Sequence, residues 1–207
     1  MTTLLQLNTS LFSNEGQSSR LAEQFVAEWT AANPEGEAIV RDLARDPVSH
    51  LTAERFQAFL TKPEERTAAQ QAEAQVSDAL IAELQRADTI VIGLPMYNFG
   101  VPSTLKAYFD HIARAGVTFK YTAKGPVGLL TGKKAYVFAA RGGIYAGTPR
   151  DTQTAYVRDF LAFLGITDVE FVYAEGLAIN EASKADALAN ARGRIENLIE
   201  SEVVAYS

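Results

Sequence analysis

The sequence of 207 residues contains no cysteine. This absence excludes disulfide bonds, zinc held by thiolates, iron–sulfur clusters and catalysis by a thiol. Histidine occurs only twice, and no spacing of acidic residues is typical of a metal site, so we expect no bound metal. Any redox chemistry would therefore come from a bound organic cofactor. We expect no side chain of the protein to be catalytic.

Long apolar runs and runs of basic residues are absent as well. No apolar stretch approaches the roughly 20 residues needed to cross a bilayer, so we expect no membrane association. The first five residues lack the basic flank and cleavage site of a signal peptide, which favours a cytoplasmic protein. The formal charge is -6, from 25 acidic and 19 basic residues, and we expect no nucleic-acid partner.

The composition is that of a globular protein, with 47% hydrophobic and 21% charged residues and no linker-like segment. We therefore expect a single domain over residues 1–207. Five short apolar runs alternate with segments of helical period, which predicts a parallel sheet with helices on both faces, a three-layer α/β sandwich. The predicted strands are Thr3 to Asn8, Glu37 to Asp42, Thr89 to Leu94, Lys134 to Ala140 and Asp168 to Ala174.

Four apolar stripes at helical spacing mark the faces that predicted helices would bury. A further Ala-rich helix is expected from Glu181 to about Val203. Two insertions interrupt the alternation: a short helix from Ala53 to Leu60 and a hairpin within 116–132. The stripes are Leu21, Phe25, Val26 and Trp29; Val76, Leu80 and Leu84; Leu105, Tyr108, Phe109 and Ile112; and Tyr156, Phe160, Phe163 and Leu164.

Ligands of open α/β sheets bind beyond the carboxyl ends of the strands, so the loops at these ends carry the functional hypothesis. Residues 9–19, after the first strand, are rich in hydroxyls and lead into a helix that starts near Ser18. The N-terminus of that helix could hold a phosphate without Lys or Arg, and the loop matches neither a Walker A nor a Gly-x-Gly-x-x-Gly pattern. This combination suits a mononucleotide. Alternatively, Ser18 or Ser19 is only an N-cap and the other hydroxyls form turns.

The loop after the third strand, residues 94–103, places two aromatic residues and an amide between two prolines and a glycine. Such a stiff loop could provide a flat wall and hydrogen-bond donors for a tricyclic ring. Its aromatic residues could instead fold into the core, which we rank second because large side chains in a strand-end loop are costly to expose without a ligand.

The loop after the fourth strand, residues 139–147, contains paired glycines that would let the backbone approach a ligand closely. Arg141 could offset negative charge on a reduced flavin. The alternative is a tight turn with a solvated arginine. Three such loops on neighbouring strands favour the ligand-binding interpretation.

Several longer motifs resemble those of the bacterial FMN-dependent NADH azoreductases, also described as NADH:quinone oxidoreductases, of the flavodoxin-like superfamily. The likeness covers essentially the full length and implies the strand order 2-1-3-4-5. The motifs are Pro-Met-Tyr-Asn-Phe at 95–99, Ala-Arg-Ala-Gly-Val-Thr-Phe-Lys-Tyr-Thr at 113–122, Gly-Leu-Leu-Thr-Gly-Lys-Lys at 128–134, Arg-Gly-Gly-Ile at 141–144 and Leu-Gly-Ile-Thr-Asp-Val at 164–169.

This resemblance implies which residues would hold a tightly bound, non-covalent FMN. It also implies a homodimer with two clefts shared between subunits, where Phe99, Tyr121, Tyr145 and Phe163 would line the substrate pocket. The phosphate and ribityl chain would contact Ser10, Gly16, Gln17 and Ser18; the ring would lie against Pro95, Met96, Tyr97, Asn98 and Phe99 on one side and Ala140, Arg141, Gly142 and Gly143 on the other.

Three positions depart from the family pattern. Gly16 and Ala140 stand where relatives often carry serine, which would remove a hydroxyl contact to FMN. Tyr145 stands where histidine is common, which would change the substrate pocket and with it the choice of acceptor.

The resemblance implies an enzyme that uses NADH or NADPH to reduce quinones by two electrons and to cleave aromatic azo compounds to amines. We expect a ping-pong order, with a proton supplied by water or by Tyr121 or Tyr145. The alternative function is a flavodoxin-type carrier that passes single electrons to partner proteins. A receiver-type signalling domain shares the strand plan, but the first strand ends in Asn8-Thr9-Ser10 and lacks the carboxylates of a phosphoacceptor site.

Overall fold

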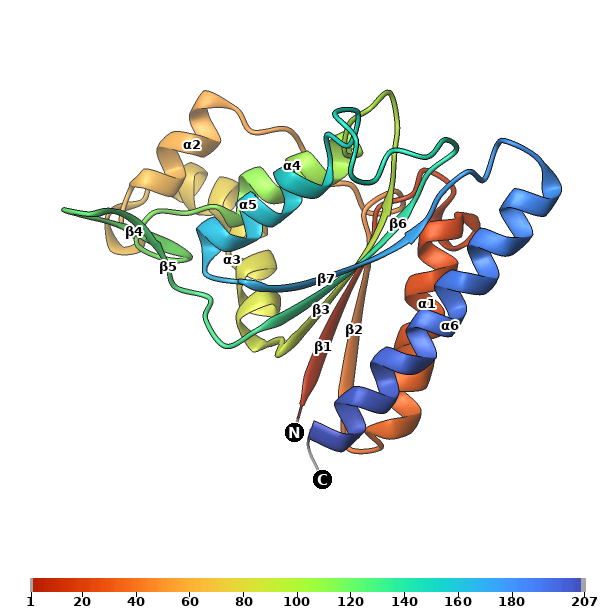
Figure 1. The fold of residues 1–207 in the computed structure, drawn as a ribbon. Helices are drawn as coiled ribbons and strands as arrows, with labels where there is room; N and C mark the ends of the chain where they lie inside the picture. The colour runs from red at the N-terminus through yellow and green to blue at the C-terminus, as the bar shows by residue number, and fades with distance from the viewer. Residues whose placement is uncertain (1, 206–207) are drawn as a thin grey trace.

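In the computed structural model, which describes residues 2–205, the five apolar runs form one parallel sheet (Figure 1). The strand order is β2-β1-β3-β6-β7, which is the predicted 2-1-3-4-5 when the strands of this sheet are counted along the chain. Every residue of β1 and β3 is buried, because helices cover both faces of the central strands. The bounds are β1 Thr3–Asn8, β2 Glu37–Asp42, β3 Thr89–Pro95, β6 Lys134–Ala140 and β7 Asp168–Ala174.

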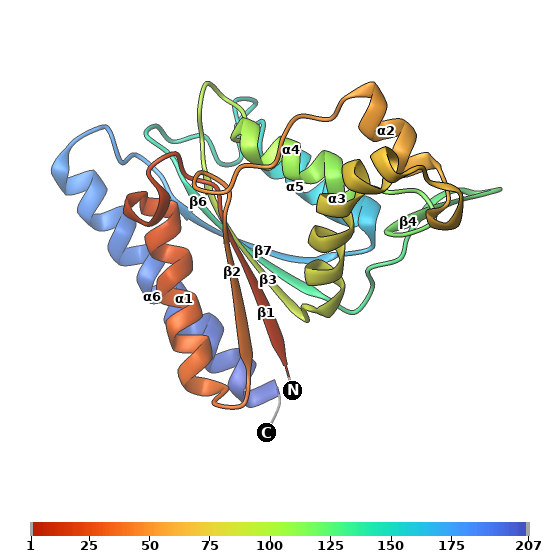
Figure 2. The ribbon, with the colours of Figure 1, turned by 180° about the vertical axis from the view of Figure 1, so that it is seen from behind.

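The helices form the two outer layers of the sandwich. Figures 1 and 2 show α1 (Gln17–Ala32) and α6 (Glu181–Ala205) on one face of the sheet, and α3 (Ala68–Arg86), α4 (Ser103–Ile112) and α5 (Thr154–Leu164) on the other. Successive strand residues point to opposite faces, so that each strand contributes to two cores. Leu4 and Val91 pack beneath α1 and α6, whereas Leu5, Ile90 and Val137 pack beneath the other three helices.

The predicted apolar stripes are buried on α1 and α4, but two details were wrong. On α3, Leu80 and Leu84 are buried as predicted, but Val76 is 49% exposed and does not belong to the buried stripe. On α5 the fully buried face is Val157, Leu161 and Leu164. The α5 aromatic side chains lie half-buried along the side of the helix, where Phe160 stacks on Phe109 of α4 at 4.0 Å between ring centroids.

The two insertions are present as predicted. The first includes α2 (Ala53–Leu60), followed by a short 3-10 turn over Pro63–Glu65, and the second is an antiparallel hairpin of β4 (Phe119–Thr122) and β5 (Gly125–Gly128). The hairpin lies at the C-terminal end of α5, where Leu130 donates its backbone N–H to the Leu164 carbonyl at 2.8 Å. An added Cβ on Gly128 would lie 2.0 Å from the Gly165 nitrogen, so only glycine allows this approach of the two backbones.

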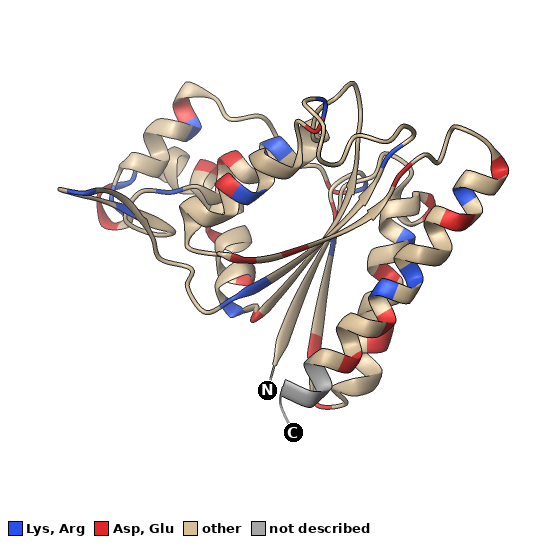
Figure 3. Cartoon of the chain, in the orientation of Figure 1, with Lys and Arg blue, Asp and Glu red and all other residues tan. Residues whose placement is uncertain are grey.

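The carboxyl ends of β1, β3 and β6 meet at one edge of the sheet, where the strand order reverses between β1 and β3. Gly93 brings β3 close to the start of α1, because a Cβ there would lie 3.0 Å from the Ser18 carbonyl oxygen. In Figure 3, basic and acidic residues are interspersed along the ribbons of α1 and α6. The fold therefore places the three loops singled out in the sequence around one crevice.

Candidate functional site

The loop after β1 is anchored by its first two residues, which are buried. Thr9 donates its hydroxyl to the Gly93 carbonyl at 2.7 Å, and the Ser10 hydroxyl accepts from the Phe12 N–H at 3.2 Å. A short 3-10 turn, Ser13–Glu15, then leads into Gly16. The anchoring brings the Ser10 hydroxyl to the N-terminus of α1.

That N-terminus has free donors. Gly16 is the N-cap of α1 and provides no side-chain cap, so the first N–H groups of the helix have no partner within it. Within the described part of the chain, the buried hydroxyls of Ser18 and Ser19 also have no hydrogen-bond partner. A Cβ on Gly16 would lie 2.1 Å from the Ser10 Oγ, so the glycine keeps this space open for the serine hydroxyl. Neutral donors and a positive helix end thus converge on one small volume.

The loop after β3 closes in a tight turn from Tyr97 to Gly100. The N–H groups of these two residues donate to each other's carbonyls, at 3.3 Å from Tyr97 and 3.0 Å from Gly100. Asn98 and Phe99 lie between them with φ of 51° and 61°, the left-handed region that non-glycine residues rarely adopt. Both side chains are exposed, so the turn presents an amide and an aromatic ring to the outside rather than to the core.

The loop after β6 turns its carbonyl groups away from the crevice. The carbonyls of Arg141, Gly142 and Gly143 all accept from N–H groups of residues 176–178. Among the residues that the structure describes, no acceptor faces the N–H groups of Gly142 and Gly143. A ligand that approaches the backbone of this loop would therefore meet N–H donors.

The side chain of Arg141 has a different role from the one we expected. Its guanidinium is fully buried and donates to Asp151 at 2.8 Å and to Glu175 at 3.0 Å. Burial raises the pKa of the Asp151 carboxyl, but hydrogen bonds from Arg141 and Thr154 outweigh it, and the pKa lies below its ordinary value. The charge of Arg141 is thus balanced inside the protein, and any contact of residue 141 with a ligand falls to its backbone.

Two side chains join the three loops into one hydrogen-bonded path. The hydroxyl of Tyr97 accepts from the Leu11 N–H at 3.1 Å and lies 3.4 Å from the Ser10 hydroxyl, which links the loops after β3 and β1. Gln153, at the start of α5, donates to the Pro95 carbonyl at 2.8 Å and accepts from the Arg141 Nε at 3.2 Å, which links the loops after β3 and β6. Four of the predicted cofactor residues, Ser10, Pro95, Tyr97 and Arg141, therefore belong to one connected structure.

The predicted pocket residues lie in two groups. Tyr145 is half-buried and packs against Phe99, with 5.5 Å between the ring centroids, and its hydroxyl lies over Gly143. Tyr121, which is 75% exposed, and Phe163 both pack against Phe119 at the hairpin end of α5. The 11 residues of α5 span about 16 Å, so one chain does not bring Tyr121 and Phe163 to the three loops.

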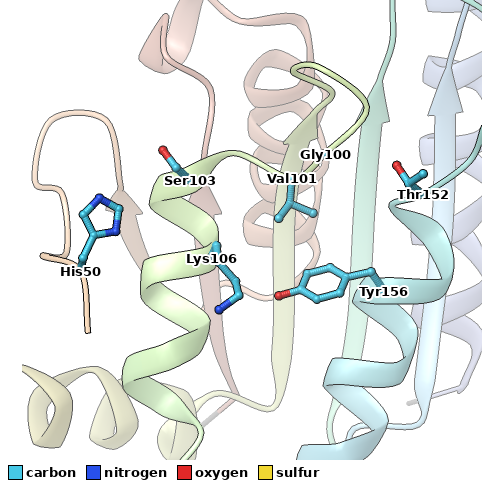
Figure 4. A pocket seen from close by; sticks show the side chains of 7 residues that line it. All are labelled: His50, Gly100, Val101, Ser103, Lys106, Thr152 and Tyr156. Atoms are coloured by element: carbon cyan, nitrogen blue, oxygen red, sulfur yellow. The ribbon is translucent and has the colours of Figure 1, made fainter. Parts of the chain in front are cut away.

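A pocket of about 430 Å³ opens between the first turns of α4 and α5, beside the turn that carries Phe99. Its walls are mainly apolar, and the side chains of Lys106 and Tyr156 point toward one another across it (Figure 4). Gly100 and Thr152, which line it, also belong to the hydrogen-bonded surroundings of the turn. The remaining lining residues are His50, Val101 and Ser103.

The second histidine is a packing residue, as its place in an apolar helix indicated. His111 is buried on α4, its Nε2 lies 3.0 Å from the Ser49 carbonyl, and its ring meets Phe59 edge-on. Among the side chains that the structure describes, residues 2–201, there is no group of three or more His, Asp or Glu that could hold a metal ion. The helices of this same stretch are all too short or too polar to span a membrane.

The residues present fit a singly phosphorylated, flat cofactor. The partnerless Ser18 hydroxyl, the uncapped start of α1 and the close approach of the Ser10 hydroxyl to Gly16 match a phosphate held without a cation. The exposed turn at Asn98 and Phe99 and the free N–H groups of Gly142 and Gly143 match a ring with polar edges.

Sequence reasoning did not identify Gln153, Asp151, Thr152 and Glu175. These residues contact no predicted ligand but hold the loops that would, through the hydrogen bonds of Arg141, Phe99 and the Tyr145 N–H. They lie in polar connecting segments with no periodicity and no spacing to the loops they bind. Nothing in a single sequence marks such partners, which only the fold brings together.

Comparisons with known proteins agree with this geometry. A family model described as flavodoxin-like fold matches residues 2–199. The chain is 59% identical over 199 residues to an FMN-dependent NADH:quinone oxidoreductase of Cellvibrio japonicus, covering 96% of this chain and 99% of that protein. It is 54% identical over 195 residues to FMN-dependent NADH:quinone oxidoreductase 6 of Burkholderia lata, covering 94% and 98%. The crystal structure of an FMN-dependent NADH-azoreductase of Bacillus anthracis in complex with FMN superposes with a TM-score of 0.88 at 28% identity, covering 98% of this chain and 100% of that one.

Proposed function

The chain belongs to the FMN-dependent NADH:quinone oxidoreductases of flavodoxin-like fold, and from this we propose that it binds FMN at the carboxyl ends of β1, β3 and β6 and reduces quinones with NADH. It is an oxidoreductase with FMN as its cofactor. One observation supports the location of the site above all others: Tyr97 and Gln153 connect the three loops around a crevice at which the buried hydroxyls of Ser18 and Ser19 have no hydrogen-bond partner among the described residues.

Each loop has its own part in holding the cofactor. The phosphate would meet the start of α1 at Gly16, Gln17 and Ser18, together with the hydroxyl of Ser10. The ring would lie between residues 95–99 and residues 140–143, with the N–H groups of Gly142 and Gly143 at its polar edge. Bound FMN supplies two-electron transfer, which no side chain of this cysteine-free sequence can perform.

The protein's own residues shape the place where the substrates bind. Phe99 and Tyr145 pack together at the mouth of the crevice and would exclude water from it. We propose a ping-pong order, because a single crevice would hold the nicotinamide and the acceptor in turn. The hydroxyl of Tyr145, which lies over Gly143, or that of Tyr121 would supply a proton to the acceptor.

The crevice would be completed by a second copy of the chain. Tyr121 is exposed on the hairpin and distant from the three loops of its own chain, so a homodimer would bring the Tyr121 and Phe163 of one copy to the loops of the other. With NADH as donor, we propose a cytoplasmic location. Azo compounds would be further acceptors, and full cleavage to amines would take two successive turnovers.

The first test is purification of the protein. We expect a yellow protein with flavin absorbance that oxidises NADH when a benzoquinone or an azo dye is added. Initial rates at several fixed acceptor concentrations should give parallel lines in a double-reciprocal plot. Intersecting lines would contradict the ping-pong order, and a colourless protein that does not take up added FMN would contradict the function itself.

A further inference from the structure

Gln153 is placed where a helix-capping residue usually lies, yet it does not cap its helix. It is the N-cap of α5, with no hydrogen bond from its side chain to the helix, and it is fully buried. Asp151 caps the helix instead, by accepting from the Thr154 N–H at 3.1 Å. The side chain of Gln153 is therefore free to turn toward the loops at the end of the sheet.

The three partners of this amide leave only one orientation for it. Its Nε2 donates to the carbonyls of Pro95 at 2.8 Å and of Gly100 at 3.0 Å, and its Oε1 accepts from the Arg141 Nε at 3.2 Å. Carbonyls only accept and a guanidinium only donates, so a flipped amide would lose all three bonds. A carboxylate at this position could keep the bond from Arg141 but could donate to neither carbonyl.

The two carbonyls bracket the turn that carries Asn98 and Phe99. Consecutive left-handed φ values at two non-glycine residues are unfavourable and persist only where the surroundings hold them. Gln153 holds both ends of this segment, and the Thr152 hydroxyl donates to the Phe99 carbonyl in its middle. The same side chain ties the segment to Arg141, and so to the loop across the crevice.

We infer that Gln153 is a positioning residue, which fixes the turn Tyr97–Gly100 against the Arg141 loop so that the wall for the FMN ring is formed before the cofactor binds. This inference rests on the proposed FMN site. It assigns Gln153 no contact with FMN or substrate, and it predicts an effect on cofactor affinity that goes beyond the loss of a buried hydrogen bond.

The experiment compares Gln153→Glu with Ser77→Ala as the matched control. Ser77 is also fully buried and donates to a backbone carbonyl, that of His111 at 2.6 Å, but it lies away from the three loops. FMN is titrated into each apoprotein and binding is followed by the quenching of flavin fluorescence. Thermal unfolding of the apoproteins and hydrogen exchange of the Tyr97 and Gly100 amides are measured alongside.

We expect Gln153→Glu to raise the dissociation constant of FMN by about tenfold or more, and Ser77→Ala to change it by less than about twofold. The Tyr97 and Gly100 amides should exchange faster only in Gln153→Glu. Unchanged FMN affinity in Gln153→Glu, or a loss of affinity in Ser77→Ala as large as in Gln153→Glu, would overturn the inference.

The two proposals fail in different ways. If the unsubstituted protein binds no FMN, the proposed function is wrong, and amide exchange in the apoprotein still decides whether Gln153 holds the turn. If Gln153→Glu does not fold, Thr152→Val replaces it, because Thr152 lies at the surface and its loss removes only the bond to the Phe99 carbonyl. We expect about threefold weaker FMN binding and faster exchange at Gly100 in that variant, and no change in either would overturn the inference.

Discussion

At the scale of single residues, the buried charges around Arg141 are unevenly balanced. One guanidinium faces two carboxylates, Asp151 and Glu175, and Glu175 also accepts from the N–H groups of Tyr145 and Ala146. The Arg141 guanidinium also lies over the ring of Tyr173, at 5.1 Å from its centroid. Removal of Asp151 would therefore leave Arg141 with a charged partner, whereas removal of Arg141 would leave two carboxylates with hydrogen bonds from neutral groups but no opposite charge.

Asp151→Asn should lower the free energy of unfolding at neutral pH by about 2 kcal/mol, because a charge-assisted bond and a helix cap are weakened. The pKa of Asp151 is lowered in the folded state. Its stabilising contribution is thus complete above the pKa of the unfolded chain, about 4, and is lost as the pH falls through the folded value. Urea unfolding between pH 2 and 7 should therefore show a shallower acid loss in the variant; equal pH slopes in the two proteins would contradict this.

The loops around the crevice could be predicted from the sequence, but the residues that hold them in place could not. Residues 9–19 and 94–103 were singled out because hydroxyl-rich and aromatic loops at strand ends are unusual, and the roles of Ser10, Ser18 and Phe99 toward a cofactor stay predictions. Gln153 and Glu175 look like ordinary loop residues. Gln153 binds Pro95, which is 58 residues away in the sequence, and Glu175 binds Arg141, which is 34 residues away. The role of Arg141 was misjudged for a related reason, since nothing in the sequence marks Asp151, Gln153 and Glu175 as its partners.

At the scale of elements, the junction between the hairpin and α5 depends on two glycines. Gly165 has φ of 102° at the end of α5, and its nitrogen lies where a Cβ on Gly128 would be. Gly128→Ala should displace the hairpin from the helix and lower the free energy of unfolding by about 1–3 kcal/mol. The variant should still bind FMN but should reduce quinones more slowly.

Gly193→Ala is the control for that substitution. Gly193 lies within α6, with no atom near the position of its Cβ, so alanine should raise the unfolding free energy by up to about 1 kcal/mol and leave activity unchanged. Thermal unfolding and NADH oxidation with a benzoquinone measure both variants. A Gly128→Ala protein as stable and active as the parent would show that the hairpin tolerates displacement.

Sequence periodicity located the elements well and their buried faces less well. The strands were predicted to within one residue, because a continuous apolar run between polar loops has only one interpretation in a doubly covered sheet. On α5, the predicted stripe follows the edge of the buried face: Leu164 is in the core, and the three aromatic residues pack against the core only partly buried. Aliphatic Val157, Leu161 and Leu164 fill the narrow space under the helix, while Tyr156, Phe160 and Phe163 lie to the side.

At the scale of the whole molecule, the proposed dimer with a shared crevice leads to a prediction about mixed dimers. Ser18→Asp should prevent FMN binding, because a carboxylate at the start of α1 would occupy the phosphate position. Tyr121→Ala should keep FMN but lose much of its activity. Neither variant supplies a complete site to itself, yet a dimer of one copy of each would contain one site with intact loops and an intact hairpin.

Co-expression of the two variants should restore about a quarter of the parent activity, since half of the dimers would be mixed and each would have one complete site. Light scattering of the same preparation measures the mass of the particle. Activity no higher than the mean of the separate variants would show that each chain forms its site alone.

The layered architecture followed from strand and helix alternation, but the strand order did not. Alternation alone is satisfied by several orders of a parallel sheet, and the order 2-1-3-4-5 came from the resemblance to a known family. The structure shows why the order matters: it puts the reversal of the sheet between β1 and β3, beneath the serine hydroxyls. The single domain over residues 1–207 stays a prediction.

The path from Ser10 through Tyr97 and Gln153 to Arg141 constrains how this chain can diverge. A substitution at either linking side chain alters two loops at once, so neutral drift at one position would need a matching change at another. Tyr97 and Gln153 should accordingly vary together, or not at all, among descendants that keep the same cofactor. Ile144, which follows Gly143 and is 64% exposed, is outside this path, so a substitution there would alter neither link between the loops.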